Sequence, residues 1–226
     1  MLLAIDTSTE MAGLALVKDS RLLAELTWHC GQNHTIQLLP QLNSLLDKIG
    51  ANLQSVTGIV VARGPGSFNG LRVGISTAKG LAFSLNAPIV GICTLEAAAY
   101  QHAETGLPIR PISGAGRGEI ATATYQRKRG KWQQLTTEHL TTPEKLIDEV
   151  QTKTVFCGEY ISLIASELVK RLGSKAVIPP YSGLFRRAGF LAELGEARLK
   201  AGNSDNVATL QPLYLRKPPI TERKHT

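Results

Sequence analysis

Two short segments of the chain contain residue types that could hold a nucleotide. Asp6 is followed by Thr7, Ser8 and Thr9, and an acidic residue with small hydroxyl groups in a strand turn can hold a nucleotide's metal and phosphates. Residues 64–74 begin Gly-Pro-Gly-Ser, a turn that exposes backbone amides at a helix start, where anions bind. The first segment has no glycine, and the second has no Gly-Lys-Ser/Thr ending. An ordinary strand turn and a tight packing turn are the alternatives. We expect a degenerate nucleotide cleft formed by Asp6, Thr7, Ser8, Gly64, Gly66 and Ser67.

The histidines and cysteines do not have the spacing of a metal site, and we expect none. The five histidines form no HxxxH or HExxH pair, and the three cysteines form no CxxC. Cys30, Cys93 and Cys157 lie among apolar neighbours, which predicts reduced core thiols in a cytoplasmic protein. The first residues lack the basic segment of a signal peptide.

The positive charge is concentrated in the second half of the chain. Residues 1–110 hold seven Lys and Arg and seven Asp and Glu, whereas residues 111–226 hold eighteen and eleven, so the net charge of +7 lies there. Such a surface can bind nucleic acid through its phosphates, although a merely solvated basic surface explains the charge equally well. The candidates for tRNA contact surround Gly130 in an expected hairpin turn and are Arg127, Lys128, Arg129 and Lys131.

The hydrophobic pattern of the first half predicts the order β-β-β-α-β-α-β-α. The expected strands are 2–5, 13–17, 22–28, 59–62 and 89–92. The expected helices are 38–49, 71–85 and 95–102.

Prolines and glycines are dense over residues 108–118, which predicts a loose connection between two domains. We therefore expect a first, partner-binding lobe over 1–107 and a second lobe over 108–226, with the C-terminal segment as a candidate for packing back on the first. The second half is expected to repeat the first with shorter elements. These elements are a hairpin of 119–126 and 132–140, a helix starting at 142, a strand at 155–157, and helices at 163–172 and 185–200.

The helix expected over 71–85 contains Gly74 and Gly80, each of which costs about 1 kcal/mol relative to alanine. Small residues in register let another backbone come close, and a helix that is apolar nearly all round must be covered on more than one face. We predict that this helix, with the leucine-rich helix over 38–49, forms a protein interface. The residues expected there are Leu42, Leu46, Leu71, Arg72, Ile75, Ser76, Lys79, Gly80 and Phe83.

Segments spread over nearly the whole chain resemble the TsaB (YeaZ) family. They are residues 5–9, 37–40, 64–74, 78–82, 211–216 and 218–221. The resemblance implies an α/β actin-like ATPase fold (ASKHA, ribonuclease H-like) with two similar lobes and mixed sheets. It also implies a dimerisation subunit for making threonylcarbamoyladenosine in tRNA. The implied partners are the catalytic paralogue TsaD, the ATPase TsaE, a second copy when the chain is alone, and tRNA through the complex.

The same resemblance implies that the chain has no catalytic activity of its own. TsaD proteins carry His-Met-Glu-Gly-His after the strand corresponding to 89–92, and here the matching residues begin with Thr94 and end with Ala98. Neither side chain coordinates a metal as imidazole does, and only Glu96 survives. We expect the chain to have no cofactor of its own, and the binding of ATP or ADP at an interface of the complex is left as an alternative. The alternative is a small actin-like ATPase or kinase, which needs an acidic phosphate turn opening the second lobe; residues 113–116 have no carboxylate.

Overall fold

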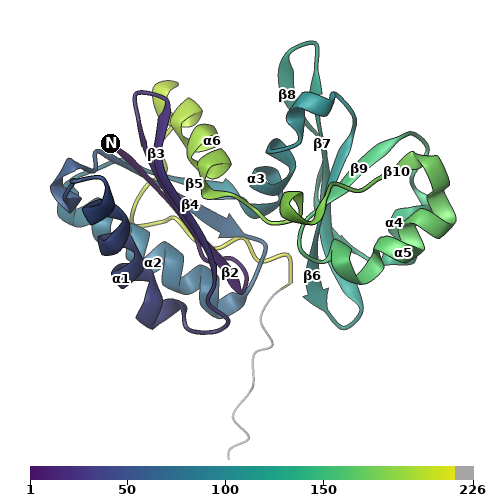
Figure 1. The fold of residues 1–226 in the computed structure, drawn as a ribbon, viewed down its shortest axis with the longest axis horizontal. Coiled ribbons are helices and arrows are strands. Elements are labelled where there is room, and N and C mark those ends of the chain that lie inside the picture. Colours follow the sequence, from purple (N-terminus) through teal and green to yellow (C-terminus); the bar gives the residue numbers. More distant parts are fainter. Residues whose placement is uncertain (217–226) are drawn as a thin grey trace, which may run out of the picture.

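The computed structural model describes residues 1–216 and shows two lobes, each built on a five-stranded mixed sheet (Figure 1). The sheet of the first lobe has the order β3-β2-β1-β4-β5. Its antiparallel meander comprises β1 (Leu2–Asp6), β2 (Met11–Lys18) and β3 (Arg21–His29). The parallel strands are β4 (Gly58–Gly64) and β5 (Ile89–Cys93).

Helices cover both faces of this first sheet. One face carries α1 (His34–Lys48) and α2 (Phe68–Leu85), and the other carries α6 (Ala188–Lys200), with α3 (Thr94–Tyr100) following β5. Along β1 the side chains alternate, since Leu3 and Ile5 pack toward α1 and α2 whereas Leu2 and Ala4 pack toward α6. Because both faces are buried, the strand is apolar at successive positions rather than at every second one.

The second lobe repeats this plan, with the order β10-β9-β6-β7-β8. Its strands are β6 (Ile109–Gly116), β7 (Glu119–Lys128), β8 (Lys131–Thr141), β9 (Thr154–Cys157) and β10 (Ala176–Val177). Its helices are α4 (Pro143–Asp148) and α5 (Ile161–Leu172). Short 3-10 turns occur at Leu53–Ser55, Ala103–Thr105, Gly173–Lys175 and Tyr181–Gly183. In both lobes an antiparallel meander comes first and parallel strands are added after it, as the expected fold class requires.

Two features differ from the sequence expectation. The segment expected to be a loose connection contains β6, the central strand of the second sheet. Pro111 has no N–H for the ladder, but Ile109 and Ile112 beside it are buried and pair with Tyr125 and Thr122 of β7. Burial of these isoleucines therefore outweighs the local effect of the proline.

The second lobe also ends earlier than expected, at β10, whereas the packing of the C-terminal segment on the first lobe was among the expectations. The second sheet ends at β10, and α6 then packs on the first sheet. After α6 the chain continues along the first lobe, where Asp205 N donates to Ile89 O at 2.8 Å and Leu213 N donates to Arg63 O. The resemblance at 218–221 lies outside the described residues. No helix within residues 1–216 has the length and apolarity needed to cross a bilayer.

Candidate functional site

The six residues expected to form a nucleotide cleft come together, but they pack on one another. The backbone N–H of Ser67 donates to the carbonyl oxygen of Ser8 at 2.7 Å. A Cβ added to Gly66 would lie 2.2 Å from that same oxygen, and one added to Gly64 would lie 2.8 Å from the carbonyl oxygen of Leu213. The glycine loop therefore closes onto the turn after β1. A phosphate-binding loop would instead leave its backbone amides open to a ligand.

The first half of α2 continues this close packing. Ser67 caps the helix by accepting a hydrogen bond from Gly70 N, and Thr7 Oγ1 donates to Gly70 O at 2.7 Å. An added Cβ would lie 2.1 Å from Thr7 O at Gly70 and 2.1 Å from Thr7 Oγ1 at Gly74. Gly74 is thus explained by packing inside the lobe. Gly80 is different, because a Cβ added there would meet no atom within 4 Å.

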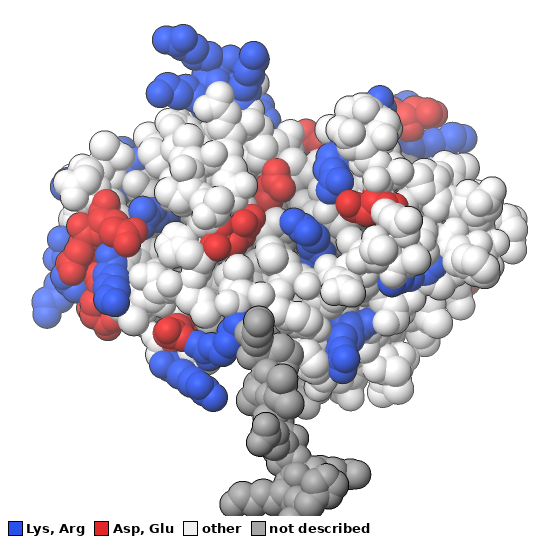
Figure 2. Space-filling view, turned by 180° about the vertical axis from the view of Figure 1, so that it is seen from behind, with Lys and Arg blue, Asp and Glu red and all other residues white. Residues whose placement is uncertain are grey.

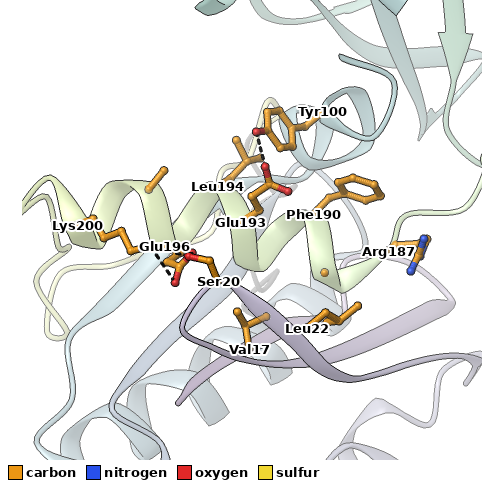
Figure 3. Close-up of a pocket in the computed structure, with 12 residues that line it drawn as sticks. Val17, Ser20, Leu22, Tyr100, Arg187, Phe190, Glu193, Leu194, Glu196 and Lys200 are labelled. Carbon is orange, nitrogen blue, oxygen red and sulfur yellow. Dashed lines mark hydrogen bonds and ion pairs between the residues drawn. The ribbon is translucent and has the colours of Figure 1, made fainter. Parts of the chain in front are cut away.

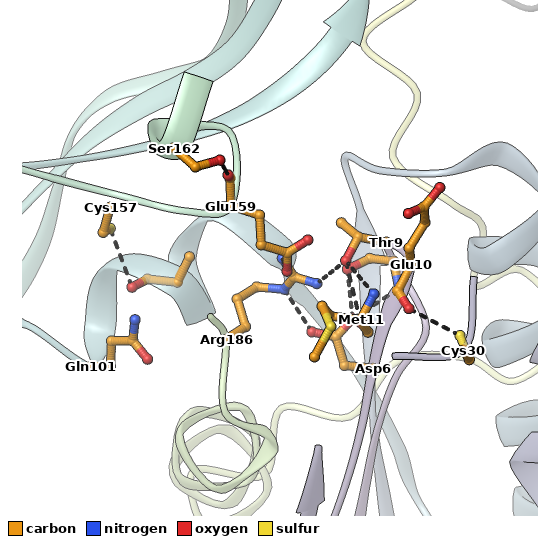
Figure 4. Close-up of polar contacts among 12 residues, drawn as sticks. Asp6, Thr9, Glu10, Met11, Cys30, Gln101, Cys157, Glu159, Ser162 and Arg186 are labelled. Atoms are coloured by element: carbon orange, nitrogen blue, oxygen red, sulfur yellow. Dashed lines mark hydrogen bonds and ion pairs between the residues drawn. The ribbon is translucent and has the colours of Figure 1, made fainter. Parts of the chain in front are cut away.

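A buried arginine fills the centre of the cleft between the lobes (Figure 4). Arg186, just before α6, donates from Nε to Asp6 Oδ2 at 2.8 Å and from Nη2 to Thr9 Oγ1 at 3.0 Å, both in the first lobe. Its Nη1 donates to Glu159 Oε1 of the second lobe at 2.9 Å. Its side chain is 6% exposed. Arg186 could not be predicted from the sequence, because a single arginine before a helix has no distinctive spacing.

This arginine sets the charge state of the cleft. Burial alone would raise the pKa of Asp6, but the Arg186 guanidinium, with hydrogen bonds from Arg186 and Ser8, outweighs burial and holds that pKa below its ordinary value. Burial would lower the pKa of Arg186, and the carboxylates of Asp6 and Glu159 instead raise it. The cleft thus holds an ion-pair cluster in which one buried guanidinium lies between two carboxylates.

A cavity of about 460 Å³ remains beside this cluster, between the two lobes. On its second-lobe side, a Cβ added to Gly114 would lie 2.9 Å from the Tyr160 ring, so the loop opening that lobe is also packed. The Asp6 carboxylate, which would face a metal–nucleotide, is bound by Arg186. Through Arg186 the cluster connects the two lobes across this cavity.

The residues matching the TsaD metal motif are structural here. Thr94 is buried and its Oγ1 accepts a hydrogen bond from Gly64 N at 3.1 Å, and Ala98 is also buried. Glu96 accepts a hydrogen bond from Trp132 Nε1 at 3.2 Å, and burial raises its pKa. Within residues 1–216, no three His, Cys, Asp or Glu side chains stand close enough together to hold a metal ion.

The expected interface residues divide into core and surface. Leu42, Leu46, Leu71 and Ile75 lie in the core of the first lobe, so they cannot form the contact surface expected of them. The reason is that a helix covering a sheet turns its largest apolar stripe inward. Lys79 is half-buried, and its amine donates to Ala208 O at 3.0 Å within the chain.

The exposed residues of α1 and α2 form what we call the outer helix face. It includes the expected residues Arg72, Ser76, Gly80 and Phe83, of which Phe83 is 84% exposed. Two apolar residues of α1 outside the expected set, Ile36 and Leu39, are 69% and 47% exposed. The spacing shows which residues share a helix, but only the packed lobe shows which stripe faces outward.

The four basic residues expected to contact tRNA lie on the β7–β8 hairpin, but they are not equivalent. Arg127 forms an ion pair with Glu104 and stacks over the Tyr100 ring, so it is not the open cation expected. Lys128, Arg129 and Lys131 are exposed at the hairpin tip. Figure 2 shows Lys and Arg side chains projecting at the upper left, where this tip lies.

A groove of about 590 Å³ runs between α6, the β2–β3 turn and Tyr100 (Figure 3). Its carboxylates are already used inside the chain: Glu193 accepts from the Tyr100 hydroxyl at 2.7 Å, and Glu196 accepts from the Ser20 hydroxyl at 2.9 Å. Arg187 at its end pairs with Glu25. The charged groups lining this groove are therefore engaged in holding α6 in place.

Comparison with known proteins agrees with this architecture. Component A of (R)-2-hydroxyglutaryl-CoA dehydratase from Acidaminococcus fermentans superposes with a TM-score of 0.54 at 10% identity, covering 88% of this chain and 98% of that one. That likeness concerns the fold alone, and it identifies the class: a two-lobed protein of the actin-like ATPase fold. The structure of YeaZ from Pseudomonas aeruginosa superposes with a TM-score of 0.80 at 27% identity, covering 95% of this chain and 99% of that one.

Sequence relatives narrow the class to one family. The protein of Bacillus subtilis (strain 168) named tRNA threonylcarbamoyladenosine biosynthesis protein TsaB is 34% identical over 218 residues, which are 95% of this chain and 93% of that protein. Residues 29–172 match the profile described as TsaD, tRNA N6-adenosine threonylcarbamoyltransferase. The chain belongs to the TsaB (YeaZ) family, within the wider group that this profile describes.

Proposed function

We propose that this chain is the non-catalytic dimerisation subunit of a cytoplasmic machinery that makes threonylcarbamoyladenosine in tRNA. Membership of the TsaB family supports the pathway. The match to the TsaD profile supports pairing with a catalytic chain of similar fold, because two related lobes can present similar helices to one another. The observation that carries the non-catalytic role is the Arg186 cluster, which neutralises Asp6 inside the cleft.

The alternative function, a small ATPase or kinase, is less well supported. A nucleotide in the cleft would have to displace a guanidinium that makes hydrogen bonds to three partners and open a glycine loop bound to Ser8. ATP or ADP at an interface with a partner subunit remains compatible with this arrangement, since such a site would not require the cleft. Steady ATP hydrolysis by the pure chain, abolished by Asp6→Asn, would support the alternative.

The outer helix face is the surface that we propose for pairing, both with the TsaD subunit and with a second copy when the chain is alone. Phe83, Ile36 and Leu39 give it exposed apolar area, and Gly80 leaves room for a partner backbone. A face that pairs with its own copy is self-complementary, so a structurally similar paralogue can replace one copy. The ATPase TsaE and tRNA would then join the assembled pair.

Two substitutions test this surface without touching the core. Gly80→Leu fills the open space, and Phe83→Asp places a charge where an apolar contact is expected. Both should convert the dimer to monomer in light scattering and abolish co-purification with TsaD, because overpacking and a desolvated charge each oppose association. The matched control is Val169→Asp on α5 of the other lobe, where the side chain is 53% exposed.

Native circular dichroism of all three variants would show that the fold survives. If Gly80→Leu and Phe83→Asp remained dimeric and still bound TsaD, the pairing surface would lie elsewhere. The role itself is tested by reconstitution: tRNA modification by TsaD and TsaE should require this chain, and modification that proceeds equally well without it would contradict the proposal.

A further inference from the structure

The tip of the β7–β8 hairpin carries positive charge that the folded chain does not neutralise. Lys128, Arg129 and Lys131 are exposed, and none of them forms an ion pair with a carboxylate of residues 1–216. Arg127, one residue earlier, pairs with Glu104. The hairpin therefore changes along its length from internally paired charge at its base to open charge at its tip.

Folding alone does not favour these residues at the tip. Lys128 and Lys131 are direct partners across the antiparallel ladder, where like charges repel. Arg129 and Gly130 have φ values of +52° and +76°, in a turn where Asn and Gly are the preferred residues. An arginine in the left-handed region and a lysine pair across the strands both destabilise the isolated hairpin. A ligand that uses the three cations would account for them.

The base of the hairpin is held firmly enough to present this tip. The rings of Tyr125 and Trp132 stack with centroids 5.6 Å apart and an interplanar angle of 2°. Trp132 Nε1 donates to Glu96, and the Arg127 guanidinium lies over the Tyr100 ring. These contacts bind the ribbon to α3, so the cations project from a fixed support (Figures 1 and 2).

We infer that this tip binds the phosphate backbone of the tRNA that the assembled complex modifies. The inference rests on the proposed function, which provides the polyanion. Three closely spaced cations can neutralise neighbouring phosphates, and such contacts position a nucleic acid without reading its sequence. Along β8, Gln133, Thr136 and Thr137 are also exposed and offer hydrogen bonds to ribose hydroxyls.

The position of the tip suits simultaneous binding of RNA and a protein partner. In Figure 1 the hairpin rises from the second lobe, whereas α1 and α2 lie on the far side of the first lobe. A subunit seated on the outer helix face would therefore leave the tip open. This arrangement assigns one partner to each lobe.

The test compares two triple variants with equal changes in net charge. The tip variant is K128Q/R129Q/K131Q. The control is K153Q/K170Q/K175Q, which changes three exposed lysines elsewhere on the second lobe that form no ion pair within the described chain. Binding of unmodified tRNA is measured over a salt series, both for the complex with TsaD and for the chain alone.

The tip variant should reduce the slope of log K against log salt by about 2–3 and weaken binding roughly tenfold or more at low salt, since each lost phosphate contact lowers the slope by about 1. The control should keep the wild-type slope, because a diffuse effect of net charge would appear equally in both variants. An unchanged slope for the tip variant in an intact complex would overturn the inference and leave the proposed function standing.

Two further outcomes are decisive. If the wild-type chain failed to pair with TsaD, the proposed function would fail, and the salt series on the chain alone would still decide whether the tip binds tRNA. Polyglutamate serves as a probe for an acidic protein partner. If the tip variant lost binding to polyglutamate but kept its binding to tRNA, the tip would be a surface for an acidic protein, and the inference would be wrong.

Discussion

Replacing Arg186 by methionine removes the central charge of the cleft but keeps a side chain of similar length. Asp6 would stay buried, 4% exposed, with hydrogen bonds from Ser8 alone. Removing one partner of a buried ion pair costs about 3–5 kcal/mol, because the other charge is left uncompensated. For a chain of this size each kcal/mol corresponds to about 2–4 °C, so the variant should melt roughly 6–20 °C below the wild type.

An exposed ion pair provides the control. Arg171 is paired with Asp148, and their side chains are 39% and 67% exposed. Exposed pairs contribute at most about 1 kcal/mol, so Arg171→Met should change the melting temperature by only a few degrees. Both variants remove one positive charge, and the comparison therefore isolates burial.

The pH dependence gives an independent measurement. In the wild type the pKa of Asp6 lies below its ordinary value of 3.8, so its contribution to stability is present above that value and is lost as pH falls through the folded pKa. Without Arg186, only the hydrogen bonds from Ser8 oppose burial, and the pKa of Asp6 should rise above the unfolded value. The charged carboxylate then destabilises the variant near neutral pH, and protonation relieves this at lower pH.

The difference in unfolding free energy between wild type and Arg186→Met should consequently be largest near pH 7 and shrink toward about pH 4. Urea denaturation across this range measures it. The reasoning would be refuted by an Arg186→Met variant that loses no more stability than Arg171→Met, or by a deficit that stays constant over the range.

Two further predictions concern packing and reactivity. Gly70→Ala should lower the free energy of unfolding by about 2 kcal/mol or more, because the added Cβ would meet the Thr7 carbonyl oxygen. Gly80→Ala should instead raise the free energy of unfolding by up to about 1 kcal/mol, because its added Cβ meets no atom and alanine favours the helix. Equal effects of the two substitutions in thermal melts would contradict this difference. Burial raises the pKa of Cys93 to about 12, and it also raises the pKa of the fully buried Cys157. Because the thiolate is the reactive form, iodoacetamide should alkylate both cysteines only when the protein unfolds. Labelling of the native protein at the rate of free cysteine, seen by mass spectrometry, would show that these thiols are accessible.

The local sequence determined most of the secondary structure, because the period at which apolar residues recur differs between a helix and a strand that bury one face. The spacing of the leucines predicts the helix that became α1, and the apolar run at 59–62 predicts the buried strand β4. Family-specific motifs then identified the fold class. Hydrophobic periodicity and short motifs involve residues close together in the chain, so these features could be predicted from the sequence.

The character of the site was decided by tertiary structure. Asp6 and Arg186 are 180 positions apart, and no local pattern indicates that one neutralises the other. Gly74 and Gly80 look alike in the sequence, yet one packs on Thr7 and the other faces open space. Long-range packing decides which of these glycines is covered, because it brings together surfaces that are distant in the sequence. Periodicity along one helix shows only that the helix has an apolar face, and it does not show what covers that face.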